Sequence, residues 1–184
     1  DSMAQLHRHN EHVRYVVVFQ NWLKPAGASI DHLHKQVVAI DEVGADNESV
    51  LPKAVLDPGI FNRWGPDFAV EHGLVLACND GAVMTVGFGH RYPSVEVWST
   101  SRVDQPWRVD DEGIDAVSDL LHAAHVAVSD DVPANEEWHY RPMGTGVPVP
   151  WRIILKLRTS TLAGFEGGTK IYVNTISPTT LAAM

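Results

Sequence analysis

Cysteine is almost missing from this sequence, which has one such residue, Cys78, in 184. A single cysteine excludes a disulfide framework within the chain and a structural zinc site built from cysteine pairs. Long apolar runs are missing too, since none approaches the roughly 20 residues needed to cross a bilayer. The first residues lack the basic stretch and apolar segment of a secretory signal. We therefore expect a cytoplasmic protein.

Basic residues are in the minority, with 14 lysines and arginines against 23 acidic residues and a formal net charge of −9. This excess argues against sequence-independent binding to nucleic acid or to anionic membranes, because nothing offsets the phosphate repulsion. A small phosphorylated ligand stays compatible with it, since such a ligand needs only a local group of donors. Hydrophobic residues at 45% and charged residues at 20% are typical of a globular chain.

The hydrophobic pattern predicts an α+β fold with a mostly antiparallel sheet. A continuous apolar run at 15–19 predicts a strand covered on both faces, and alternation within 32–40 predicts a second strand. Further strands are expected at 73–78, 82–88, 94–99, 138–140 and 151–157.

Helical spacing predicts a long helix from Asp110 to Val128, and residues 1–11 are typical of the end of another helix. The acidic, Gly- and Pro-containing stretch 41–57 predicts a loop, and 164–184 predicts a loop with a short strand. The stretch 41–57 is the expected connection between two parts of the chain.

The segment 21–36, NWLKPAGASIDHLHKQ, carries the pattern with chemical meaning. On a strand, His32 and His34 would project to one face, and Gln36 would continue the row. The turn Gly27-Ala28-Ser29 has backbone N–H groups and a hydroxyl that can hold an anion. An imidazole beside a bound phosphate can act as a nucleophile or as a general acid or base. Gln36 cannot shuttle a proton, which favours a phosphorylated histidine over activation of water. A His-x-His pair alone is more often a surface feature or a weak metal contact.

Taken in order, Phe19-Gln20-Asn21, Gly27-Ala28-Ser29 and His32-Leu33-His34-Lys35-Gln36 resemble the histidine-triad (HIT) superfamily, and in particular its galactose-1-phosphate uridylyltransferase branch. A looser similarity at Trp138-His139, Trp151–Ile153 and Gly164–Glu166 extends it over nearly the whole chain. The resemblance implies a HIT-like antiparallel sheet with flanking helices. Residues 1–54 would end a first, catalytic HIT-like domain, and 55–184 would form a second.

The resemblance also implies a role for each matching residue. His34 would be the nucleophile that takes a nucleoside monophosphate, and Gln36 would hydrogen-bond the phosphoryl group. The implied substrate-binding residues are Asn21, Gly27, Ser29 and, on the hexose, Glu166.

The metal sites implied by the resemblance are incomplete in this sequence. His32 matches a zinc-ligating position, but the other zinc ligands would lie upstream of this chain. In the second half no His-x-His pair accompanies His139, so no iron is predicted. Leu33 stands where the family usually has proline. Because the chain begins at Asp1, we expect a fragment or processed product completed by an upstream polypeptide, with a trimmed but complete chain as the alternative.

The activity implied by the resemblance is transfer of a nucleoside monophosphate between phosphate compounds through a covalent nucleotidyl-histidine. The type enzyme is a UDP-glucose–hexose-1-phosphate uridylyltransferase of galactose metabolism, and a homodimer is implied with it. Two alternatives stay open. One is a dinucleoside polyphosphate phosphorylase or nucleotide hydrolase, and the other is a catalytically degenerate module that binds a nucleotide or a partner protein.

The helical pair His122 and His125 lacks a nearby carboxylate in the sequence and predicts a partly buried helix face.

Overall fold

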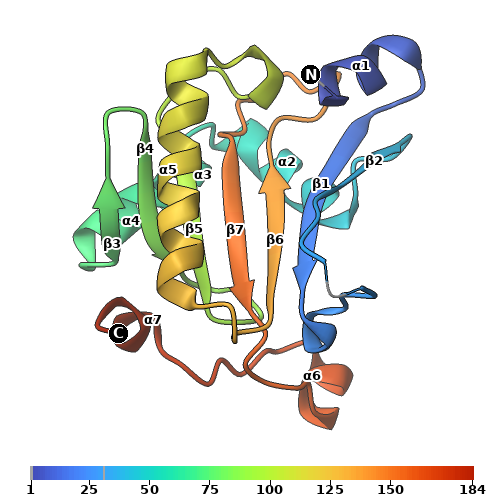
Figure 1. Cartoon of the computed structure of the whole chain (residues 1–184). Helices are drawn as coiled ribbons and strands as arrows, with labels where there is room; N and C mark the ends of the chain where they lie inside the picture. The colour runs from blue at the N-terminus through green and yellow to red at the C-terminus, as the bar shows by residue number, and fades with distance from the viewer. Residues whose placement is uncertain (1, 31) are drawn as a thin grey trace.

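The computed structural model describes residues 2–30 and 32–184. One antiparallel sheet runs through them, with the strand order β2-β1-β6-β7-β5-β4-β3 (Figure 1). The strands are β1 (Tyr15–Trp22), β2 (Gln36–Ile40), β3 (Val75–Cys78), β4 (Ala82–Gly87), β5 (Ser94–Ser99), β6 (Ala134–His139) and β7 (Arg152–Leu157). The predicted α+β class with an antiparallel sheet is confirmed.

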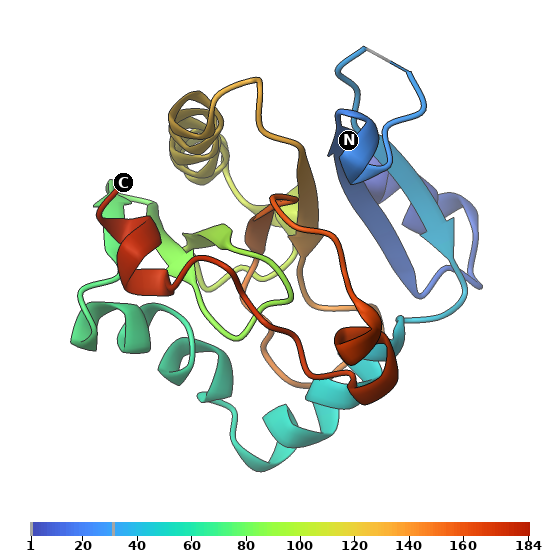
Figure 2. The same ribbon diagram turned by 90° about the horizontal axis from the view of Figure 1, so that it is seen from below.

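Helices lie on both faces of this sheet. They are α1 (Ser2–His9), α2 (Ala45–Leu56), α3 (Ile60–Arg63), α4 (Pro66–Glu71), α5 (Asp111–Val128), α6 (Gly164–Thr169) and α7 (Pro178–Ala182). Figure 2 shows α5 on one side of the sheet and the α2–α4 segment on the other. No helix in the described ranges is long and apolar enough to cross a membrane.

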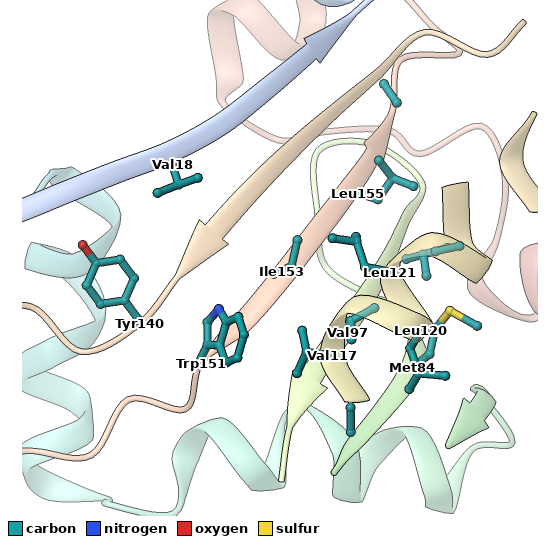
Figure 3. Packing of buried hydrophobic residues seen from close by; sticks show 14 of the residues in the cluster. Val18, Met84, Val97, Val117, Leu120, Leu121, Tyr140, Trp151, Ile153 and Leu155 are labelled. Atoms are coloured by element: carbon teal, nitrogen blue, oxygen red, sulfur yellow. The ribbon is translucent and has the colours of Figure 1, made fainter. Parts of the chain in front are cut away.

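The main core lies between α5 and the sheet. The buried face of α5 presents Val117, Leu120, Leu121 and Ala124, at the spacing of one helical face. They pack in one cluster with Val97 and residues of β7 (Figure 3). Asp110 begins the helix as predicted, because its carboxylate accepts a hydrogen bond of 2.9 Å from the backbone N–H of Gly113.

Three local predictions from the sequence are wrong. The expected loop at 41–57 contains helix α2, because Ala54 packs, fully buried, in a cluster with Phe61 and Trp98 that outweighs the Gly and Pro signals. The expected strand at 32–40 begins only at Gln36, where pairing with β1 begins. The chain after residue 163 forms the short helices α6 and α7 instead of a loop with a strand.

The division at residues 54 and 55 stays a prediction. Strands from both sides of it belong to the same sheet, since β1 pairs with β6 from Phe19↔Glu137 to Trp22↔Ala134. This pairing sets the end of β1, where the motif begins, against residues more than a hundred positions away in the chain.

Candidate active site

The histidine motif directly precedes β2, and its last residue, Gln36, is the first residue of that strand, next to β1. Gln36 pairs directly with Phe19, so its side chain lies on the same face of the sheet as those of Phe19 and Asn21. Lys35 and Leu33 instead line a cavity on the α5 side. The motif therefore divides its side chains between the two faces of the sheet.

His34 is held by its own segment. Its Nδ1 lies 2.6 Å from the backbone oxygen of His32. A carbonyl oxygen only accepts, so Nδ1 carries the proton in this hydrogen bond, and in the neutral imidazole Nε2 then keeps its lone pair. The rings of His32 and His34 are nearly parallel, at 11°, with centroids 6.4 Å apart. This arrangement presents Nε2 of a half-buried imidazole as a nucleophile.

The turn before the histidines is closed by its own backbone. Gly27 has φ +90° and donates its N–H to the Lys24 oxygen over 2.9 Å, while Ala28 N–H donates to Leu23 over 3.2 Å. These two amides are therefore engaged within the turn, whereas the Ser29 side chain is exposed to solvent. The substrate-binding roles of Gly27 and Ser29 stay predictions.

Asn135 was missed by the sequence reasoning, and it organises this end of the sheet. Its side-chain Nδ2 donates to Asn21 Oδ1 and to the backbone oxygen of Ala26, each over 2.7 Å. Arg158 in turn donates to Asn135 Oδ1 over 2.8 Å. Since Asn21 uses its oxygen in this network, its amide N–H groups stay the part suited to a phosphate oxygen. The strand predicted at 138–140 does not reach Asn135, and only the register of β6 with β1 identifies its partner.

A cavity of about 480 Å³ lies on the same face and is lined by Phe19, Asn21, Asn135, Glu137 and His139, among others. Lys156 Nζ lies 2.6 Å from Glu137 Oε2, and His139 Nε2 lies 3.6 Å from the same oxygen. Burial acts to raise the pKa of Glu137, but His139 and Lys156 outweigh it and lower that pKa to about 2. Glu137 is thus an anion that engages Lys156.

Glu166 lies in α6, away from any strand. Its carboxylate accepts a hydrogen bond of 3.1 Å from the Ala163 backbone N–H, at the start of that helix. Because this contact lies within the first turn of α6, the Glu166 carboxylate acts as a helix cap. Contact of Glu166 with a hexose stays a prediction.

The zinc implied at His32 needs about four ligands. Within residues 2–30 and 32–184, no three His, Cys, Asp or Glu side chains come together as a metal site. His32 alone does not fit a zinc ion, and we derive no step through one. Its role as a ligand stays a prediction that depends on residues outside this chain.

On the opposite face, a cavity of about 730 Å³ lies between the end of β1 and the end of α5, lined by Trp22, Leu33, Lys35, His122 and His125, among others. The prediction that the helical histidines lack a carboxylate partner is wrong for His125. Its Nε2 lies 2.9 Å from Oε2 of Glu136, which comes from β6.

The sequence matches the family described as "Domain of unknown function (DUF4921)" over residues 1–184. The chain belongs to this family. No curated protein matches it.

Among solved structures, this DUF4921 chain is similar to an ADP-glucose phosphorylase from Arabidopsis thaliana with bound ADP-glucose. The TM-score is 0.81 at 23% identity, over 98% of this chain and 62% of that one. A galt-like protein from the same plant gives a TM-score of 0.79 at 21% identity, over 98% and 64%. A uridylyltransferase gives 0.75 at 19% identity, over 99% and 62%.

These similarities show that the chain shares the fold of these three proteins, which agrees with the fold that the motif implied. The DUF4921 chain spans less than two thirds of the length of each of these three structures. The reaction, substrates and partners of the whole protein therefore do not follow from these similarities, and we treat them as proposals.

Proposed function

We propose that this chain carries the nucleotidyl-transfer centre of a uridylyltransferase-like enzyme, with His34 as the nucleophile. The observation that supports this most directly is the 2.6 Å contact of His34 Nδ1 with the His32 oxygen. In the neutral imidazole this contact favours the tautomer in which Nε2 can attack phosphorus without a base to remove a proton first.

The proposed reaction has two steps. In the first, Nε2 of His34 attacks the α-phosphorus of a nucleotide sugar, a P–N bond forms, and the bond to the bridging oxygen breaks, so that a sugar 1-phosphate leaves. In the second, an acceptor phosphate attacks the same phosphorus and regenerates the imidazole. Gln36 and Asn21 lie on one face of the sheet and would donate hydrogen bonds to the phosphoryl oxygens, whose charge grows in each transition state.

The donor and the acceptor define two versions of this proposal. A hexose 1-phosphate as acceptor gives a UDP-glucose–hexose-1-phosphate uridylyltransferase, as in galactose metabolism. Inorganic phosphate as acceptor gives a phosphorylase, a version favoured by the similarity to an ADP-glucose phosphorylase. Both versions use the same histidine, and both allow a homodimer and an upstream polypeptide that completes the nucleotide pocket.

The test is intact mass spectrometry of the purified protein after incubation, in separate samples, with UDP-glucose, ADP-glucose, ATP and a diadenosine polyphosphate, without acceptor. We expect an acid-labile nucleoside monophosphate adduct from one donor that is absent from His34→Asn. His12→Asn, which changes an exposed histidine, should keep the adduct. No adduct from any donor with the full-length protein would contradict the nucleotidyl-histidine and favour a binding module.

The isolated adduct then separates the reactions. Addition of galactose 1-phosphate, of inorganic phosphate or of buffer alone should discharge it at different rates. Discharge that needs the hexose phosphate indicates the transferase, and discharge by phosphate indicates the phosphorylase. Equal discharge in buffer alone indicates a nucleotide hydrolase.

A further inference from the structure

Lys35 lies between the proposed nucleophile and Gln36 but faces the other side of the sheet. Its ammonium forms an ion pair with Oε1 of Glu136 on β6. The Glu136 side chain is fully buried, whereas the Lys35 side chain is 41% exposed. The ion pair therefore joins a surface segment to a fixed point in the core.

Glu136 is held by three donors from three segments. Besides Lys35, Trp138 Nε1 lies 2.6 Å from Oε1 and His125 Nε2 lies 2.9 Å from Oε2. Burial alone would raise the pKa of Glu136, but the hydrogen bond of His125 and the charge and hydrogen bond of Lys35 outweigh it and lower that pKa. The carboxylate stays ionised, so its attraction for Lys35 persists at neutral pH.

The sheet itself does not hold the histidines. The pairing of β1 with β2 ends at the Phe19–Gln36 pair, and residues 32–35 lie outside the strand. A ring placed by a local contact to the His32 oxygen needs a backbone that stays in place. The ion pair of Lys35 with Glu136 anchors the chain at the residue that directly follows His34.

We propose that Lys35 is a positioning residue for His34, and that its ion pair with Glu136 fixes the 32–36 backbone so that the His34 ring keeps Nδ1 on the His32 oxygen. This proposal rests on the proposed function for its catalytic meaning. Its structural content, the tautomer of His34, is measurable whether or not the chain turns over a nucleotide.

The first experiment is long-range ¹H–¹⁵N NMR of the histidine side chains, with the His34 signals assigned by their loss in His34→Asn. We expect the wild-type protein to show one His34 tautomer, protonated on Nδ1. In Lys35→Met the His34 ring should show a mixture of two tautomers, one protonated on Nδ1 and one on Nε2, as in a free imidazole. Lys53→Met, which changes an exposed lysine on α2, should leave the spectrum unchanged, and Lys35→Arg should restore the wild-type tautomer.

A double-mutant cycle tests whether Lys35 acts through Glu136. Glu136→Gln alone should give the same tautomer mixture, and the double variant Lys35→Met with Glu136→Gln should add nothing further. The double variant leaves no unpaired buried charge, so it serves in place of Lys35→Met if that variant does not fold. Additive effects would overturn the coupling.

Kinetics separate this proposal from the proposed function. In Lys35→Met the rate of adduct formation should fall about tenfold or more, while the donor concentration giving half-maximal rate changes little. If the wild-type protein forms no adduct, the proposed function fails and the NMR result still decides the role of Lys35. An unchanged His34 tautomer in a folded Lys35→Met, or a mixed tautomer in the wild-type protein, would overturn the positioning role.

Discussion

Asn135 Nδ2 lies 2.7 Å from Asn21 Oδ1, and this contact joins β6 to the end of β1. The same nitrogen donates to the Ala26 oxygen, so one side chain holds both the strand end and the turn that follows it. Two residues separated by 114 positions thus set the geometry at the start of the proposed phosphate site.

Replacement of Asn135 by alanine should loosen this turn. It removes two hydrogen bonds from Nδ2 and the acceptor of Arg158, and we expect a loss of about 1–3 kcal/mol in the free energy of unfolding. Urea unfolding measures this loss, and nucleotide adduct formation should weaken with it. Asn62→Ala, at an exposed position on α3, is the matched control. Equal stabilities of the two variants would contradict the role assigned to Asn135.

The central strand β7 should show the cost of a cavity. Leu155 is 1% exposed and packs between the sheet and α5, so Leu155→Ala should lower the free energy of unfolding by about 2–5 kcal/mol. Leu56 is 88% exposed, and Leu56→Ala should change stability by less than about 0.5 kcal/mol. Denaturant unfolding followed by tryptophan fluorescence measures both. Similar losses would show that the core does not lie where the structure places it.

The sequence patterns predicted the elements whose periodicity was strong. Strand β5 occupies the predicted residues 94–99, and α5 begins after its predicted cap at Asp110. These elements have many regularly spaced apolar residues, so local sequence and tertiary packing favour the same structure. The similarity in fold to the three solved structures was predicted from the order of three short motifs and not from periodicity.

Long-range partners could not be predicted in this way. Helix α2 forms because Ala54 meets a cluster on the sheet, and nothing within 41–57 reveals that surface. The pairing of Glu136 with His125 and Lys35 likewise depends on the strand order, which places β6 beside β1. A pattern shows which face a residue occupies, but a partner across the sheet requires the register.

The left-handed backbone at Gly27 gives a prediction about the turn. At φ +90° an alanine is strained, although a Cβ there would lie 3.9 Å from Asn21 Nδ2 and meet no clash. We expect Gly27→Ala to cost about 1–2 kcal/mol in the free energy of unfolding. Gly167→Ala, in α6 with open space and no positive φ, should be neutral or slightly stabilising. A Gly27→Ala variant with the same free energy of unfolding as the wild-type protein would contradict the positive φ at Gly27.

Glu137 should make the protein less stable in acid. Because its pKa is lowered from 4.5 to about 2 in the folded protein, its ionised form stabilises the fold above pH 4.5. This contribution is lost as the pH falls from about 4.5 towards 2. A third of the side chain is exposed and solvent screens the pair with Lys156, so we expect about 2 kcal/mol.

Urea unfolding at several values from about pH 6 to pH 2 tests this pH dependence. Glu137→Gln should be less stable than the wild-type protein at pH 6, and the difference should shrink towards pH 2, since the carboxyl is then protonated in the unfolded chain and about half protonated in the folded protein. Glu11→Gln, at a glutamate whose side chain is 90% exposed, should follow the wild-type curve throughout. A constant difference between Glu137→Gln and the wild-type protein across this range would show that Glu137 contributes through packing and not through its charge.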